Sequence, residues 1–175
     1  MSRVFLAGSR KITRLPTAVR TRLEEIVRRA MEVVVGDANG SDRALQAQLA
    51  EWNYPRVTVF HVGRAPRNNV GDWPTRRIET AAGAKGFDFY AAKDRAMAQE
   101  ADCGLMLWDG VSRGTLTNVA DLVEHGKPVA IYVSPLQRCV SLRTPAELEA
   151  LAGPDAGRFL PSVEVGQSQV ALELV

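Results

Sequence analysis

The sequence has little of several features that mark specialised classes of protein. Among its 175 residues are only two cysteines, Cys103 and Cys139, which lie far apart without the spacing of a metal site or a disulfide framework. No apolar run is long enough to cross a membrane, and the run Val4–Ala7 is too short for the core of a signal peptide. These absences predict a cytoplasmic protein with reduced cysteines and no membrane partner.

An excess of charge of one sign is also lacking. The chain has 22 Lys and Arg residues against 20 Asp and Glu, a formal net charge of +2. Extended nucleic-acid binding usually needs a large basic face, so nucleic acid is not an expected partner. The two histidines, His61 and His125, have no carboxylate or cysteine neighbours at ligand spacing, so we expect neither a metal nor a cofactor.

Apolar segments alternate with helical patterns along most of the chain. Strands are predicted at Arg3–Ala7, Glu32–Val35, Arg56–Val62, Cys103–Trp108 and Val129–Val133. Helices are predicted at Ala18–Met31, Ser41–Trp52, Ala91–Ala101 and Thr115–His125. Because strand–helix–strand units build parallel sheets, this order predicts an α/β, Rossmann-like, doubly wound and mainly parallel sheet of about five strands, with helices on both faces.

The last part of the chain has weaker patterns. We expect residues 1–134 to form the Rossmann-like nucleotide-binding domain, and residues 135–175 to form an extension packed on that domain or on a partner subunit. Within the extension, a short helix is expected over residues 145–152. Val170–Val175 is expected to be an edge strand or a contact with another subunit.

Gly63–Gly86 interrupts the alternation with prolines, asparagines and glycines. We expect a long excursion with a short helix near Arg76–Ala82, since loops of this length are commonly functional or mobile. Its arginines make the segment basic, which favours a lid over a phosphate ligand or a contact between subunits; a nucleic-acid contact and a solvated surface remain alternatives. These arginines are Arg64, Arg67, Arg76 and Arg77.

Three predicted strands end in polar turns that contain glycine, at Gly8–Arg10, Gly36–Asp42 and Asp109–Thr115. Ligands of open α/β sheets bind at the carboxyl ends of the strands, where glycine lets the backbone approach closely and helix N-termini attract phosphate. The turns therefore predict a site for a phosphate-containing nucleotide-type ligand. The predicted ligand-binding residues are Gly8, Ser9, Arg10, Gly36, Asp37, Ala38, Gly40, Ser41, Asp42, Asp109, Ser112, Arg113, Gly114, Thr115 and Asn118.

Several of these side chains have a structural alternative. Asp37 is expected to stabilise its turn, whereas Asp42 and Asp109 are equally suited to a ligand or catalytic role and to capping. Ser41 is expected to be a helix N-cap. Arg10 suits bidentate binding of phosphate, and the same holds for Arg113.

Three further side chains also have two readings. Asn118 is expected either to bind a ribose or base edge or to bond its own helix. Trp73 and Tyr90 flank the excursion and are expected either to stack on a base or to pin the excursion to the body. The dinucleotide fingerprint GxGxxG is absent, which excludes an ordinary NAD dehydrogenase.

In order along Val4–Val133 the chain carries GSRK, GDANGSD, KDRAM and SRGT followed by GKPV. With these motifs it resembles the SLOG superfamily, most nearly its YspA-like branch, which is related to the LOG phosphoribohydrolases and to DprA. The resemblance implies a Rossmann-like fold, a nucleotide-derived ligand bound by the turns named above, and a homodimer or higher homo-oligomer.

The chain departs from the LOG pattern PGGxGTxxE. Gly114 and Thr115 match its GT pair, but Asn118 stands where the pattern has its glutamate. The arginine of the family falls on Lys93, with Arg95 as a candidate substitute. An amide cannot act as a general base, so the resemblance implies binding more than catalysis.

We therefore expect a binding module for a nucleotide or an ADP-ribose-like ligand. One alternative is an N-glycosidase, phosphoribohydrolase or nucleoside transferase that uses a different carboxylate, and another is DprA-like nucleic-acid binding. The catalytic candidates for the enzyme are Asp42, Asp109, Lys93 and Arg95.

Overall fold

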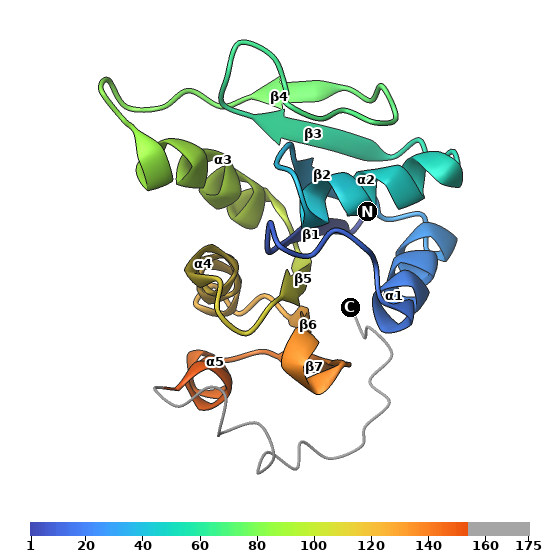
Figure 1. The fold of residues 1–175 in the computed structure, drawn as a ribbon, viewed down its shortest axis with the longest axis vertical. Coiled ribbons are helices and arrows are strands. Elements are labelled where there is room, and N and C mark those ends of the chain that lie inside the picture. The colour runs from blue at the N-terminus through green and yellow to red at the C-terminus, as the bar shows by residue number, and fades with distance from the viewer. Residues whose placement is uncertain (154–175) are drawn as a thin grey trace.

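Seven strands form one sheet in the order β4-β3-β2-β1-β5-β6-β7 (Figure 1). The structure is a computed structural model and describes residues 1–153, so the strand predicted at Val170–Val175 lies outside the described part. All neighbouring strands are parallel except β6 and β7, which are antiparallel. The strands are β1 (Arg3–Gly8), β2 (Glu32–Gly36), β3 (Val57–His61), β4 (Thr75–Arg77), β5 (Cys103–Trp108), β6 (Val129–Val133) and β7 (Arg138–Leu142). The predicted α/β, mainly parallel architecture is confirmed.

Helices cover both faces of the sheet. Figure 1 shows α1 and α2 on one side of it and α3, α4 and α5 on the other. A short 3₁₀ turn (Ser134–Leu136) links β6 to β7. The helices are α1 (Thr17–Arg28), α2 (Ser41–Glu51), α3 (Gly86–Glu100), α4 (Arg113–Val123) and α5 (Pro145–Ala152).

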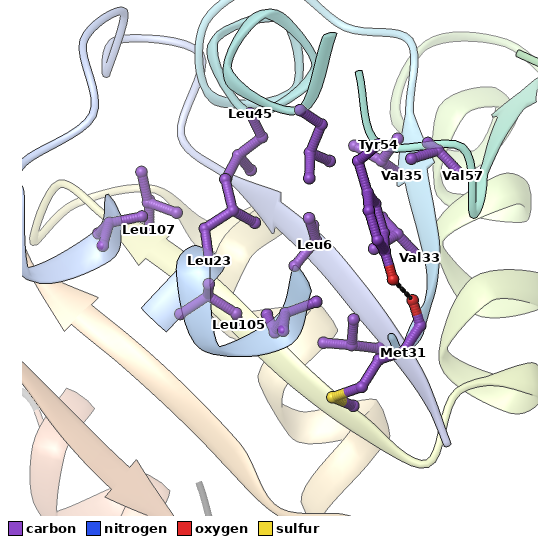
Figure 2. Close-up of a cluster of buried hydrophobic side chains, with 14 of the residues drawn as sticks. Leu6, Leu23, Met31, Val33, Val35, Leu45, Tyr54, Val57, Leu105 and Leu107 are labelled. Atoms are coloured by element: carbon purple, nitrogen blue, oxygen red, sulfur yellow. Dashed lines mark hydrogen bonds between the residues drawn. The ribbon is translucent and has the colours of Figure 1, made fainter. Parts of the chain in front are cut away.

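The apolar strands supply a core to each face. In β1, Leu6 packs with Leu23 of α1 and Leu45 of α2, whereas Phe5 belongs to the cluster on the α3 and α4 side. Figure 2 shows the first cluster, in which the Tyr54 hydroxyl also donates a hydrogen bond to the Met31 carbonyl. Because neighbouring residues of a strand point to opposite faces, strands buried on both sides need continuous apolar runs.

The direction of winding reverses between β1 and β5. From β1 the chain passes through α1 to β2 and through α2 to β3, whereas β5 lies on the other side of β1 and continues through α4 to β6. The two series of crossover helices lie on opposite faces of the sheet. This reversal opens a crevice at the carboxyl ends of β1 and β5, the usual ligand position in such folds.

The excursion differs from its prediction. The prediction of a short helix near Arg76–Ala82 is wrong, because Thr75–Arg77 form the edge strand β4, parallel to β3. The indole of Trp73 is buried and donates a hydrogen bond to the Tyr54 carbonyl at 2.8 Å, which holds the chain beside β3 so that its backbone pairs there. Helix α3 also begins at Gly86, five residues before the predicted start.

The C-terminal half of the sheet contains one more strand than predicted. Arg138–Leu142 turn back as β7 along β6, and Pro145–Ala152 form the expected short helix, α5. Both cysteines are free, and burial raises the pKa of the Cys103 thiol to about 12. Within residues 1–153, no helix has both the length and the apolar character that crossing a membrane would require.

Candidate functional site

A cavity of about 620 Å³ lies at the reversal point, where β1 and β5 end. Its walls come from the turn after β1, the turn between β2 and α2 with the first turn of α2, α3 as far as Arg95, the loop after β5, and α4 as far as Asp121. Turns that are distant in the sequence therefore meet around one space. The predicted residues that line it are Gly8, Ser9, Arg10, Ala38, Asp42, Lys93, Arg95, Asp109, Ser112, Gly114, Thr115 and Asn118.

The remaining predicted residues lie outside the lining. Gly40 takes the N-cap position predicted for Ser41, because its φ of +81° and its contact with the Arg10 backbone leave no room for a side chain. Ser41 is the first residue of α2, and its hydroxyl donates to the Ser9 carbonyl at 2.8 Å. Gly36 and Asp37 lie behind the wall, and Arg113 is exposed at the start of α4.

Asp109 organises the loop between β5 and α4. Its carboxylate accepts hydrogen bonds from the backbone N–H groups of Val111 at 3.0 Å and Ser112 at 2.7 Å. It also accepts from the Ser9 hydroxyl at 2.8 Å, which ties this loop to the turn after β1. Burial alone would raise the pKa of Asp109, but these donors together lower it, so the group is a structural anion of the two turns.

Two helices begin at the cavity without a side-chain cap. The side chains of Lys85, before α3, and Ser112, before α4, accept no hydrogen bond from a backbone N–H in the first turn of their helices. The first residue of α3, Gly86, lines the cavity, and so does the first turn of α4 around Gly114. Uncapped first-turn N–H groups carry partial positive charge and are donors for an anion.

Three exposed cations add to this positive potential. Arg10 and Lys11 follow β1, and Arg95 projects from α3; all three line the cavity. None of them forms a salt bridge with any residue in the described range 1–153. Their charges are therefore available to a bound ligand.

A buried charge cluster forms the floor. Asp42 is 5% exposed and Lys93 is 4% exposed, and both side chains reach Gly36, where an added Cβ would collide with both. Lys93 Nζ lies 2.7 Å from Asp94 Oδ1, and the Asn118 amide donates to Asp94 Oδ2 at 3.4 Å. Because residue 36 is glycine, the side chains of Asp42 from α2 and Lys93 from α3 can both approach the end of β2.

The pKa values of Asp42 and Lys93 in this cluster differ from their ordinary values. Burial raises the pKa of Asp42 to about 6, against the opposing effect of Lys93. Burial alone would lower the pKa of Lys93, but Asp94 and Asp42 outweigh it and raise the pKa. The floor therefore holds a permanent cation beside a carboxyl group that titrates close to neutral pH.

The excursion contacts the site from outside. None of residues 63–85 lines the cavity; instead the Arg67 guanidinium makes two hydrogen bonds to Asp37, at 2.7 and 3.1 Å. The Arg67 guanidinium also lies 4.7 Å from the ring centre of Tyr90, which does line the cavity. In this arrangement the segment braces the wall.

Several lining residues were not predicted from the sequence. Asp94 directly follows Lys93 in the KDRAM motif, and Asp121 follows Asn118 by three positions and shares its helix face. Phe87 and Val111 carry no sequence signal of a site. Among the residues the structure describes, no group of three or more His, Cys, Asp or Glu side chains is placed to hold a metal ion.

No family model matches the sequence, and no curated protein matches it. Solved structures with a similar fold include the following two. DNA processing protein A from Helicobacter pylori, whose structure concerns single-stranded DNA binding, superposes with a TM-score of 0.55 and 15% identity over 74% of this chain. The molybdenum cofactor binding protein from Rippkaea orientalis has a TM-score of 0.52 and 17% identity, over 75% of this chain and 76% of its own.

At these identities the comparison supports the fold alone. This chain spans 64% of the length of the DNA processing protein A chain. The similarity agrees with the Rossmann-like architecture, and the chemistry of the cavity rests on the residues described above.

Proposed function

We propose that this protein binds a phosphate-containing nucleotide-type small molecule, a nucleotide or an ADP-ribose-like derivative, in the manner of the YspA-like SLOG proteins it resembles. One observation carries the proposal: two helix N-termini without a side-chain cap converge on a single cavity with three cations that form no salt bridge within residues 1–153. Each of these features attracts anions, and a phosphate satisfies the N–H groups and the charges together.

The size and polarity of the cavity suit such a ligand. Small-molecule sites commonly measure about 300–1,000 Å³, and this cavity of about 620 Å³ lies within that range. Asp94 and Asn118 also line the cavity and offer carboxylate and amide groups to hydroxyls. We propose that the ligand's phosphate binds at the start of α4 and that its sugar lies towards α3.

A second candidate function is favoured by Asp42. Its carboxyl group lines the cavity and has a pKa raised to about 6, which suits a general acid or base near neutral pH. In that case the protein cleaves or transfers at an N-glycosidic bond. Binding of nucleic acid is the less favoured alternative, since the net charge of the whole chain is only +2.

The test is a panel of AMP, ADP, NAD and ADP-ribose, followed by calorimetry for affinity and chromatography for product. We expect at least one member to bind without turnover, and Arg10→Ala to weaken its binding. Arg20→Ala, an exposed position on α1 outside the cavity, is the matched control. If the unaltered protein forms a product and Asp42→Asn does not, the protein is an enzyme that uses Asp42. If no member of the panel binds, the proposal is refuted.

A further inference from the structure

The aromatic residues expected to stack on a base are already occupied. Trp73 is 8% exposed, and its indole N–H is bonded to the Tyr54 carbonyl. Tyr90 lies at the cavity wall, with the guanidinium groups of Arg67 and Arg10 4.7 and 5.4 Å from its ring centre. Tyr90 also packs edge-on against Phe89, with a ring separation of 5.2 Å. Any base in this cavity therefore needs another partner.

Two other apolar side chains stand open at the cavity. Phe87, in the first turn of α3, is 61% exposed, and Val111, in the loop after β5, is 72% exposed. Both line the same cavity from different elements. Single exposed apolar residues are ordinary, but two that border one concave site beside its charged groups mark a place for an apolar part of a ligand.

The fold fixes the backbone that carries Val111 and sets Phe87 beside the first turn of α4. Asp109 accepts hydrogen bonds from the backbone N–H groups of Val111 and Ser112, and the Trp108 indole donates to the Ser112 carbonyl at 3.1 Å. The backbone that carries Val111 is therefore fixed. On the other wall, the Phe87 ring lies 4.0 Å from the point that a Cβ on Gly114 would occupy, beside the first turn of α4.

We infer that Phe87, supported by Val111, is the stacking platform for a planar heteroaromatic base, so that the ligand is a base-bearing nucleotide rather than a bare sugar phosphate. The inference rests on the proposed function, because it concerns the same cavity. It extends the proposed function to the base of the ligand, which the charged groups do not recognise. Stacking of a base on an aromatic ring tolerates different bases, so Phe87 selects for the presence of a base.

The experiment compares AMP with ribose 5-phosphate, which has the same sugar and phosphate but no base. Calorimetric affinities are measured for the unaltered protein, for Phe87→Ala and for Phe87→Trp. Val70→Ala is the control, since Val70 is another exposed apolar residue and lies outside the cavity. We expect Phe87→Ala to weaken AMP binding about tenfold or more, with ribose 5-phosphate unaffected and Phe87→Trp close to the unaltered protein.

The outcomes separate this inference from the proposed function. If both ligands bind the unaltered protein and Phe87→Ala changes neither affinity, or lowers both equally, the stacking role is wrong while the phosphate site stands. If neither ligand nor any other member of the nucleotide panel binds, both proposals fail. If Phe87→Ala alters only the oligomeric state measured by light scattering, Phe87 is a subunit contact and the inference is overturned.

Discussion

At the scale of single residues, Gly114 is a position where the stability of the fold and the proposed phosphate binding favour different amino acids. It is the second residue of α4, outside the group of glycines with positive φ, so the helix itself does not require glycine there. A Cβ at this position meets only Phe87, at an ordinary contact distance of 4.0 Å. Glycine within a helix costs about 0.5–1 kcal/mol relative to alanine. Glycine at this position fits the proposed approach of a phosphate to the backbone at the first turn of α4.

We predict that Gly114→Ala raises the free energy of unfolding by up to about 1 kcal/mol and weakens AMP binding. The added methyl group stands in the cavity at the first turn of α4, where it obstructs a phosphate oxygen. Loss of one charge-assisted hydrogen bond corresponds to roughly tenfold in affinity or more. Urea denaturation and calorimetry measure the two effects. Unchanged AMP affinity would place the phosphate elsewhere.

At the scale of elements, the segment of residues 63–72 is held mainly through Asp37 and Gln46. Arg67 bonds the Asp37 carboxylate through its backbone N–H at 3.0 Å as well as through its guanidinium. The backbone N–H of Val70 donates to the Gln46 side chain at 2.9 Å. Asp37 is 2% exposed, and although burial opposes ionisation, Arg67 lowers its pKa. The segment thereby stabilises a buried charge at the end of β2.

We predict that Arg67→Ala lowers the free energy of unfolding by about 1–3 kcal/mol, because it deprives the buried Asp37 carboxylate of its guanidinium partner. Amide exchange of residues 63–72 is expected to accelerate more than exchange in the sheet. Arg64→Ala is the matched control, since Arg64 is exposed and forms no salt bridge within residues 1–153. Equal effects of the two variants would contradict the bracing role of Arg67.

For the whole molecule, the buried carboxylates give opposite contributions to the pH dependence of stability. Asp42 has a pKa of about 6 in the folded state against an ordinary 3.8, so the folded state holds its proton more tightly. Its contribution to stability is complete below pH 4 and is lost as the pH rises through 6. Asp37 has a lowered pKa, so its contribution is present above pH 4 and is lost on acidification.

We predict that Asp42→Asn removes a decline in stability between pH 4 and pH 6 of up to about 3 kcal/mol. Asp37→Asn is the comparison, and its difference from the unaltered protein is expected to have the opposite trend, growing as the pH rises towards 4 and staying constant above it. Denaturation curves at half-unit steps of pH measure both. Parallel profiles for the unaltered protein and Asp42→Asn would show that Asp42 ionises normally.

Local sequence by itself determined the central sheet and the edge that carries the cavity. Apolar runs such as Val33–Val35 are short, continuous and rich in β-branched residues, and strands buried on both faces require this pattern. The turns that follow β1 and β5 are predictable because a turn depends on the glycine and polar residues within a few positions of the strand end. The five predicted strands and the meeting of Ser9, Asp109 and Gly114 at one cavity follow from such local signals.

Tertiary structure alone decided which side chains line the cavity. Thr75–Arg77 became a strand only because Trp73 is anchored on the body, and Arg138–Leu142 only because β6 offers a free edge. Lys93 meets Asp42 from across the sheet, while Tyr90 is occupied by arginines from two other segments, which leaves Phe87 open. Contacts of this kind join residues that are distant along the chain, and their energy depends on burial and distance, which only the folded arrangement sets.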